Sequence, residues 1–310
     1  MLKKILLVIL CAYGMIVNAK ELITVEFSSI PSQSNATPYL KMLDIANTLQ
    51  DKYEFVLEFK PGGNSLVAMK AMDQSPTNRI STTSPAFAEN VLTGQLNEND
   101  YVAITTQGDA CWAVITNIGD TRTGIASLKG QKEIVVGGVG YGTSAHLAAI
   151  IISKRYGFKI RYIPYKANIE ALTQMASGQP INFVIERISN YKNFKQKNPN
   201  LEVLGINCPH RNPLMPEVKT LAEQGFDVPT IFMTTLANVK MPAEKRREIS
   251  QILDQAQMQL GNKYMMESAD MYAPMFANPK IPTEEFFNRR VLQMKVLLHR
   301  YEKEVEDAKK

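Results

Sequence analysis

The sequence predicts an α/β protein with two lobes, and three observations carry this prediction. Strand-like and helix-like segments alternate along most of the 310 residues, as in a parallel sheet with crossover helices. Gly157 and Gly178 come shortly after two of the expected helices, where glycine commonly ends a helix. After Pro242 the pattern changes to amphipathic helices with charged outer faces, which favours a late segment that packs back onto the first lobe.

The N-terminus has the composition of a secretory signal peptide. Lys3 and Lys4 precede an apolar run over residues 5–17, and the small residue Ala19 suits signal peptidase. We therefore expect residues 1–19 to be a signal peptide that is removed on export. A retained membrane anchor is less favoured, because the run is shorter than the roughly 20 residues of a spanning helix. Lipoprotein attachment at Cys11 is disfavoured by the large Leu10 before it.

Charge and cysteine content exclude several classes of function. Loss of the leader lowers the formal net charge from +5 to +3, which is too small and too scattered to indicate a nucleic-acid partner. Three histidines and the cysteines form no cluster at metal-ligand spacing, so neither a metal nor another cofactor is expected. Cys111 and Cys208 each lie beside a strand-like run, and the sequence leaves open one disulfide or two free thiols.

The expected elements follow one another in a regular order from residue 22 onward. The strand-like segments are short runs rich in β-branched and aromatic residues. They cover residues 22–27, 54–59, 80–83, 102–105, 112–116, 133–136, 159–163, 181–185 and 201–206. The helix-like segments have apolar residues at helical spacing. They cover residues 38–49, 65–72, 144–156, 169–176, 244–259, 264–272 and 284–304.

This order predicts two lobes that share the chain unequally. Lobe 1 is expected to contain residues 20–106 and 231–310, and lobe 2 residues 107–230. The chain then crosses between the lobes twice, near 106 and near 230. Two short crossings favour hinge motion and a ligand held in the cleft between the lobes.

Ligands of open α/β sheets sit beyond the carboxyl ends of the strands, and the first two such loops are rich in small polar residues. In residues 28–38, Thr37 can cap a helix whose first residue is Pro38. We expect this loop to form a lip of the cleft that is rich in hydrogen-bond donors. The candidate binding residues in it are Ser34, Asn35, Ala36 and Thr37. After the strand at 80–83, Ser84 is a further ligand candidate, although a Ser-Pro turn explains it equally well.

The third loop, residues 137–147, reads GGVGYGTSAHL. Glycines let the chain curl, and a helix that starts directly behind them points its amide groups at an anion. The binding candidates are Gly140, Tyr141, Gly142, Thr143 and Ser144. No lysine follows the glycines as in a Walker loop, and their spacing fits a dinucleotide fingerprint poorly. A purely structural turn is the alternative.

Four further residues come from neighbouring positions. His146 lies inside the expected helix, and we interpret it as a brace of the loop, because nothing in the sequence selects triad partners for it. Tyr165 follows the strand at 159–163, and Glu186 and Arg187 follow the strand at 181–185. Their shared position at strand ends favours the cleft, with solvated surface charges as the alternative.

Several ordered stretches resemble the substrate-binding proteins of tripartite tricarboxylate transporters, the Bug or TctC family. Each stretch is weakly specific alone, and together they span much of the mature chain in the right order. They are KPGGN at 60–64, GVGYGTSAHL at 138–147, IPYK at 163–166, SGQ at 177–179, RNPLMPEV at 211–218 and TLAEQG at 220–225.

The resemblance implies a periplasmic binding protein of type II, with two Rossmann-like lobes that close over a small carboxylate. In the family, the loop after the first strand and the glycine loop grip one carboxylate through amides, hydroxyls and water, which here implies 34–37 and 140–144. Ser84, Tyr165, Glu186 and Arg187 are then expected to read the far end of the ligand.

The chain departs from the family pattern in the first loop. Family members commonly carry Gly-Gly, then Asp, then Arg, where this chain has Asn35-Ala36, Tyr39 and Leu43. The helix and strand pattern persists through these changes, so they bear on the ligand and not on the fold.

We therefore expect a non-enzymatic, monomeric receptor that delivers an organic carboxylate to the membrane permease subunits of such a transporter. One alternative is an orphan sensor subunit that docks onto a membrane receptor. The other is a secreted serine hydrolase that uses Ser144 or a nearby serine with His146.

Overall fold

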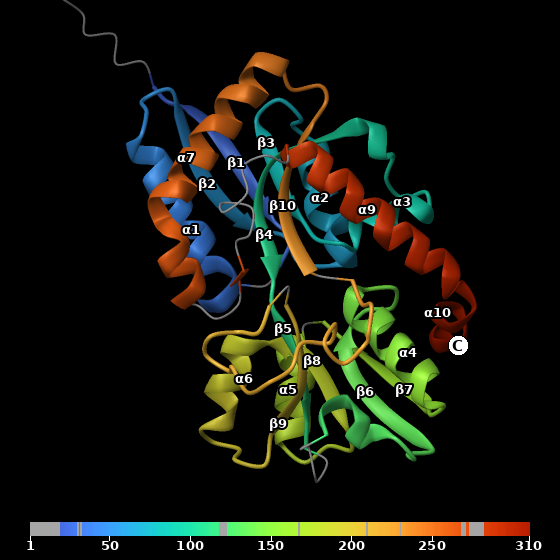
Figure 1. Ribbon diagram of the computed structural model, residues 1–310. Coiled ribbons are helices and arrows are strands. Elements are labelled where there is room, and N and C mark those ends of the chain that lie inside the picture. Colours follow the sequence, from blue (N-terminus) through green and yellow to red (C-terminus); the bar gives the residue numbers. More distant parts are fainter. Residues whose placement is uncertain are drawn as a thin grey trace, which may run out of the picture.

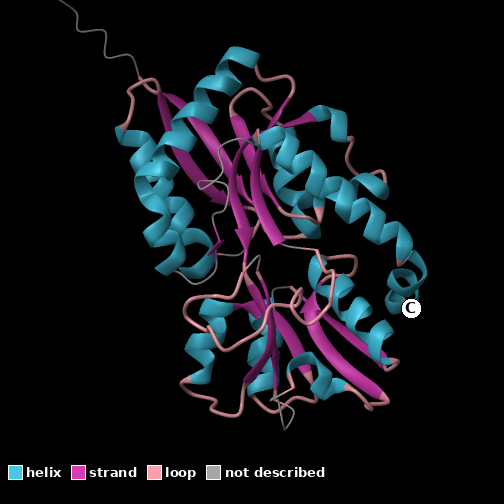
Figure 2. Cartoon of the chain, viewed as in Figure 1, coloured by secondary structure: helices cyan, strands magenta, loops and turns pink. Residues whose placement is uncertain are grey.

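The structure, a computed structural model, describes residues 19–29, 31, 33–117, 123–166, 168–208, 210–229, 231–267, 271–272 and 282–310. Two sheets, each flanked by helices, form the two lobes of an α/β fold (Figures 1 and 2). The expected signal peptide lies almost wholly outside the described residues. Among those residues, no helix combines the length and the apolarity needed to cross a bilayer.

The sheet of lobe 1 has six strands in the order β11-β4-β10-β3-β1-β2. Its strands are β1 (Glu21–Phe27), β2 (Tyr53–Phe59), β3 (Arg79–Thr83), β4 (Tyr101–Ala110), β10 (Ile231–Asn238) and β11 (Met271–Tyr272). The sheet of lobe 2 has five strands in the order β7-β6-β8-β5-β9. Its strands are β5 (Trp112–Thr116), β6 (Glu133–Val139), β7 (Lys159–Tyr165), β8 (Phe183–Arg187) and β9 (Glu202–Asn207).

Both sheets are mixed, and the expectation of a purely parallel arrangement was wrong. β10 runs antiparallel to β3 and β4, and β5 runs antiparallel to β8 and β9. These two strands enter their sheets directly from the other lobe. The strands parallel to one another in each sheet end toward the opposite lobe, so a strand that arrives from there starts at that edge and must run backward. β11, which follows α7 of lobe 1, is also antiparallel to β4.

The helices cover both faces of each sheet. Lobe 1 carries α1 (Gln33–Thr48), α2 (Leu66–Asp73), α3 (Phe87–Leu92), α7 (Ala243–Glu267), α9 (Thr283–Arg300), α10 (Glu302–Lys309) and the short 3₁₀ turns η1 (Gly63–Ser65) and η2 (Glu98–Asp100). Lobe 2 carries η3 (Gly124–Leu128), α4 (Ser144–Tyr156), α5 (Asn168–Ala176) and α6 (Ile188–Lys195). The expected lobe 2 helices at 144–156 and 169–176 correspond to α4 and α5, and Gly157 ends α4 in the left-handed conformation.

Several expected boundaries were wrong. α1 begins at Gln33, so Pro38 lies inside the helix and Thr37 does not cap it. Residues 264–272 are not one helix, because α7 ends at Glu267 and residues 271–272 form β11. β4 continues to Ala110, beyond the crossing expected near 106.

The lobes share part of their hydrophobic core. α1 and α7 cover one face of the first sheet, and α2, α3 and α9 cover the other. The hydrophobic cluster beneath α2, α3 and α9 also contains Leu147 and Ile150 of α4, which is a lobe 2 helix. These two residues belong to the same cluster as Met294 of α9 and Val305 of α10. In Figure 1, α10 accordingly lies beside α4. The C-terminal helices therefore hold the two lobes together outside the cleft.

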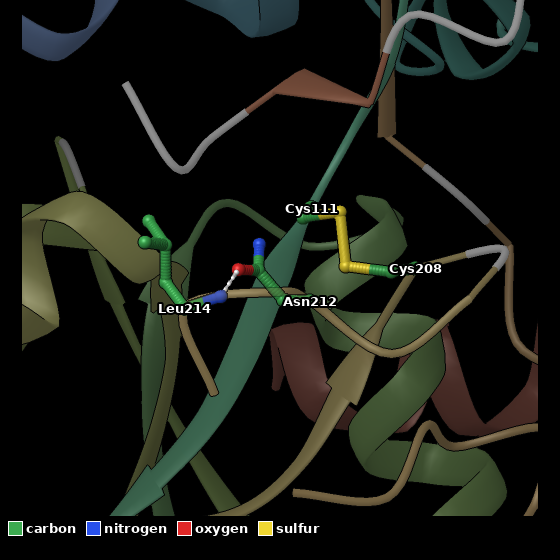
Figure 3. The surroundings of a disulfide bond; sticks show 4 residues. All are labelled: Cys111, Cys208, Asn212 and Leu214. Atoms are coloured by element: carbon green, nitrogen blue, oxygen red, sulfur yellow. Dashed lines mark hydrogen bonds between the residues drawn. A yellow bond between two sulfur atoms is a disulfide. The ribbon is translucent and has the colours of Figure 1, made fainter. Parts of the chain in front are cut away.

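A disulfide joins the first crossing between the lobes to the end of β9 (Figure 3). Cys111 is the single residue between β4 and β5, and Cys208 directly follows β9. Their Cα atoms are 4.9 Å apart and the two sulfur atoms are bonded. In the segment after Cys208, the Leu214 amide donates to Asn212 Oδ1 at 2.9 Å. Of the two alternatives left open by the sequence, the structure therefore contains the disulfide and not two free thiols.

Candidate functional site

A cavity of about 740 Å³ lies between the lobes, bordered by the carboxyl ends of strands from both sheets. From lobe 1 come the residues after β1, β2 and β3, and from lobe 2 the residues after β6, β7 and β8. The start of β10 and the β4–β5 crossing complete it. This volume is in the usual range of small-molecule sites.

The lobe 1 wall is polar and conformationally unusual. Ser28 and Ser29 line it after β1, and Ser84 and Pro85 line it after β3. After β2, residues 62–65 also line it, and all four have positive φ angles. Two of them, Asn64 (φ 53°) and Ser65 (φ 76°), are not glycine. Strained backbone of this kind persists where its surroundings hold it, and it is common at binding sites.

Side-chain amides hold this strained turn in place. Asn90, itself buried, donates through Nδ2 to the Asn64 carbonyl at 2.8 Å. Asn64 Nδ2 in turn donates to Glu89 Oε2 at 2.6 Å and lies 3.5 Å from the Tyr141 carbonyl of lobe 2. Burial raises the pKa of the Glu89 carboxyl, and the Asn64 hydrogen bond opposes this shift. The turn therefore reaches across the cleft to the glycine loop.

Close approach of lobe 1 explains two glycines of the loop. Gly140 (φ 46°) and Gly142 (φ 71°) have left-handed backbone that favours glycine. A Cβ atom on Gly140 would lie 2.9 Å from Asn64 Oδ1. A Cβ atom on Gly142 would lie 2.8 Å from the carboxyl carbon of Glu89. These glycines therefore allow the lobes to meet, besides letting the loop turn.

The N-terminus of α4 points its amide groups toward the cavity. Thr143 is the N-cap: its hydroxyl accepts from the His146 amide at 3.3 Å and donates to the Val139 carbonyl at 2.8 Å. The Leu147 amide bonds the Thr143 carbonyl. The amides of Ser144 and Ala145, which both line the cavity, thus have no partner within the helix. A helix end with such amides favours an anion.

His146 braces the loop, as expected. It is fully buried, and its Nδ1 accepts from the Gly142 amide at 3.1 Å. Burial lowers its pKa to about 4, with a smaller contribution from the charge of Lys309. The imidazole is therefore neutral at pH 7, as an acceptor at Nδ1 requires. Tyr141 and Tyr162 pack against the ring.

The opposite wall of lobe 2 carries charge. Lys166 and Arg187 line the cavity together with Glu186, and no other lining residue in the described part of the chain is charged. Glu186 is buried and accepts from the Arg187 amide at 2.5 Å. Two cations and one acid make this wall net positive. It thus complements an anionic group at the end of a ligand away from α4.

The predicted site residues fall into two groups. The cavity is lined by Ser84, Gly140, Thr143, Ser144, Tyr165, Glu186 and Arg187. Tyr141 and Gly142 belong to the same loop but face His146 and Glu89 and do not line the cavity.

Of the lip expected at 34–37, Ala36 and Thr37 do not line the cavity. These residues form the first turns of α1, Ala36 is buried in the core, and the side chains of Ser34 and Asn35 lie outside the described residues. Because α1 begins several residues before Pro38, the loop is shorter than expected. Ser28 and Ser29, which directly follow β1, line the cavity in this part of lobe 1.

Sequence reasoning missed some residues of the site. Asn64 and Ser65 carried no pattern for positive φ, and Trp112 gave no sign that it would reach the cavity. Lys166 could have been found, because it follows Tyr165 at the same strand end. The described residues contain no group of three or more His, Cys, Asp or Glu that could hold a metal.

Comparison with known proteins agrees with this architecture. Residues 122–270 match the model of the tripartite tricarboxylate transporter family receptor, TctC. A UPF0065 protein from the tcbD–tcbE intergenic region of Pseudomonas sp. (strain P51) is 27% identical over 110 residues, which are 34% of this chain. The aligned part spans only 32% of that curated relative.

Solved structures are similar over nearly the whole chain. The periplasmic binding protein BugD has a TM-score of 0.71 at 15% identity, covering 90% of this chain and 97% of its own. MatC from Rhodopseudomonas palustris with bound malate has a TM-score of 0.70 at 12% identity, covering 89% and 99%. The fold is that of the two-lobed periplasmic binding proteins, and the resemblance to receptors of tripartite tricarboxylate transporters is confirmed over residues 122–270.

Proposed function

We propose that this protein captures a small organic carboxylate in the cleft between its lobes and delivers it to the permease of a tripartite tricarboxylate-type transporter. The match of residues 122–270 to the family receptor supports the transport role. We also propose export with cleavage after Ala19 and residence in the periplasm, supported by the leader-like N-terminus and by the periplasmic proteins of the same fold.

The observation that carries the proposal is the pairing of an amide-rich helix end with a cationic wall across one cavity. The Ser144 and Ala145 amides at the start of α4 suit one anionic group. Lys166 and Arg187 line the cavity on the lobe 2 wall that lies away from α4. Amide donors and helix dipoles hold a carboxylate without burying a further charged side chain.

The geometry does not favour the hydrolase alternative. Ser144 and His146 are two positions apart on one helix, so their side chains point to different sides. Ser144 Oγ lies 3.8 Å from Met294 Sδ of lobe 1, and His146 Nδ1 is engaged by the loop amide. We therefore propose that the ligand leaves chemically unchanged, which mass spectrometry of a bound and released acid would show.

Calorimetry with a panel of mono-, di- and tricarboxylates tests the binding role. We expect at least one acid to bind and to raise the melting temperature, because a ligand that binds only the native state adds RT ln(1 + [L]/Kd) to its stability. Lys166→Met and Arg187→Met should each weaken binding by about 1.5 to 3 kcal/mol, the range for a hydrogen bond to a charged group.

Lys192→Met provides a matched control, since Lys192 is an exposed lysine of lobe 2 that does not line the cavity. Its affinity should stay within a factor of two of the parent protein. Absence of binding across the whole panel would overturn the receptor role. Equal weakening by Lys192→Met would show that the cavity wall is not the site.

A further inference from the structure

Two buried polar atoms beside the cavity have no hydrogen-bond partner among the described residues. They are the hydroxyl oxygen of Thr83 and the indole nitrogen of Trp112. The side chain of Thr83 is fully buried and that of Trp112 is almost so. Buried polar groups are nearly always paired, so each exception needs an explanation.

Both residues border the same space from opposite lobes. Thr83 is the last residue of β3 in lobe 1, and Trp112 is the first residue of β5 in lobe 2. Both line the cavity. The other buried atoms without a partner in the described chain belong to Glu26, Gln107, His146 and Gln257, and none of these residues lines it. Thr83 and Trp112 thus stand apart, because a solute can reach their surroundings.

Neighbouring side chains are already committed elsewhere. Thr234, directly opposite Thr83 in the sheet, pairs its hydroxyl with Thr106 Oγ1 at 3.2 Å. Asn207, directly opposite Trp112, donates to the Pro229 carbonyl at 2.8 Å. Neither unpaired atom is hydrogen-bonded to these cross-strand neighbours.

We propose that Thr83 and Trp112 recognise an oxygen substituent on the carbon chain of the ligand, so that the substrates are hydroxy- or oxocarboxylates. This inference rests on the proposed carboxylate-binding function and specifies its substrate class. The indole N–H only donates, whereas the threonine hydroxyl donates or accepts. A ligand hydroxyl satisfies both, because it accepts from Trp112 and donates to Thr83. An acid without this oxygen leaves both groups unpaired in a closed site, and sites of this kind discriminate strongly.

Matched acid pairs test the inference. Calorimetry with malate against succinate, and with lactate against propionate, compares ligands that differ by one hydroxyl. We expect the hydroxylated member of at least one pair to bind about tenfold tighter or more. Thr83→Val and Trp112→Phe should each reduce this ratio several-fold toward one.

Further variants separate recognition from loss of structure. Thr83→Ser keeps the hydroxyl and should keep the preference, and Thr77→Val, at an exposed threonine outside the cavity, should change neither affinity. Trp112 is the only tryptophan of the chain, so its emission reports ligand contact directly in the unmodified protein. A change in emission with the hydroxylated acid that saturating unsubstituted acid does not reproduce supports the inference.

The outcomes separate this inference from the proposed function. Binding of carboxylates without any preference for the hydroxylated members overturns the inference and leaves the receptor role standing. An unchanged preference in both Thr83→Val and Trp112→Phe also overturns it. Failure of every acid to bind overturns the receptor role, and this inference with it.

Discussion

Single residues in the glycine loop connect the backbone to the ligand site. Gly140 and Gly142 allow Asn64 and Glu89 of lobe 1 to approach the loop closely. Nδ1 of His146 accepts a hydrogen bond from the Gly142 amide. The loop that presents the α4 amides is therefore fixed from both lobes. Its shape depends on the protonation state of one buried imidazole.

The pKa of His146 makes stability depend on pH. Burial, with a smaller effect of the Lys309 charge, lowers the pKa of His146 in the folded protein to about 4, from the ordinary value of 6.5. Between pH 6.5 and 4 the unfolded chain binds a proton that the folded protein does not. The contribution of neutral His146 to the free energy of unfolding is thus fully present above pH 6.5. It is lost as the pH falls toward 4, by up to about 1.4 kcal/mol per pH unit.

A substitution that cannot titrate should remove this part of the pH dependence. His146→Asn offers an amide oxygen near the position of Nδ1, so it should keep the loop contact and flatten the fall in melting temperature between pH 7 and pH 5. His146→Leu also flattens it but loses the acceptor for Gly142, so it should be less stable at pH 7. An unaltered pH profile in both variants would contradict the assignment.

Helices and strands show where local pattern suffices and where it does not. α4 and β5 match their expected bounds because glycine, capping and apolar spacing agree there. β10, with Thr234 and Thr235 at its centre, was not expected. Its pairing with both β3 and β4 stabilises it, and that is a tertiary contact.

α6 was not predicted from the sequence, and the site was predicted only in part. α6 contains Ser189, Asn190 and Asn193, which favour turns when read alone. Parallel strands end at one edge, so Ser84, Tyr165 and Arg187 could be placed near the cavity from sequence. The contact of Asn64 with the glycine loop could not, since it depends on how the two lobes pack. The early start of α1 likewise hid the part played by Ser28 and Ser29.

The C-terminal helix α10 should contribute stability through its contact with α4. Val305 is buried in the cluster that includes Leu147 and Ile150 of lobe 2, and Glu304 pairs with Lys154 of α4. Val305→Ser removes apolar area and buries a hydroxyl, so it should lower the free energy of unfolding by about 1 to 3 kcal/mol. Urea denaturation followed by circular dichroism measures this.

Val296→Ser is the matched control in the neighbouring helix. Val296 is 48% exposed, and such a change at the surface is usually within about 0.5 kcal/mol. Similar losses from both substitutions would mean that α10 does not bind α4 in solution. A selective loss at Val305 would mean that the C-terminal helices hold the lobes together even without ligand.

At the scale of the whole molecule, the two crossings define how the lobes can move. The first passes through Cys111, which the disulfide ties to Cys208 at the end of β9, and the second leads into β10 at Ile231. Cys111 also lines the cavity. Hinge motion in the first crossing must therefore occur on the lobe 1 side of this bond. The α4–α10 contact restrains the same motion on the outer face.

Removal of the disulfide should destabilise the protein chiefly through its unfolded state. The bond joins residues 97 positions apart, and its loss frees a long loop in the unfolded chain, worth about 2 to 5 kcal/mol in the chain-entropy model. Cys111→Ala with Cys208→Ala should lower the urea midpoint by a corresponding amount, as should reduction of the parent protein. A reductant should have no effect on the double variant, which separates bond loss from side effects of the reagent. Equal midpoints for oxidised and reduced parent protein would show that the two thiols are not bonded in solution, and the first crossing would then not be tied to the end of β9.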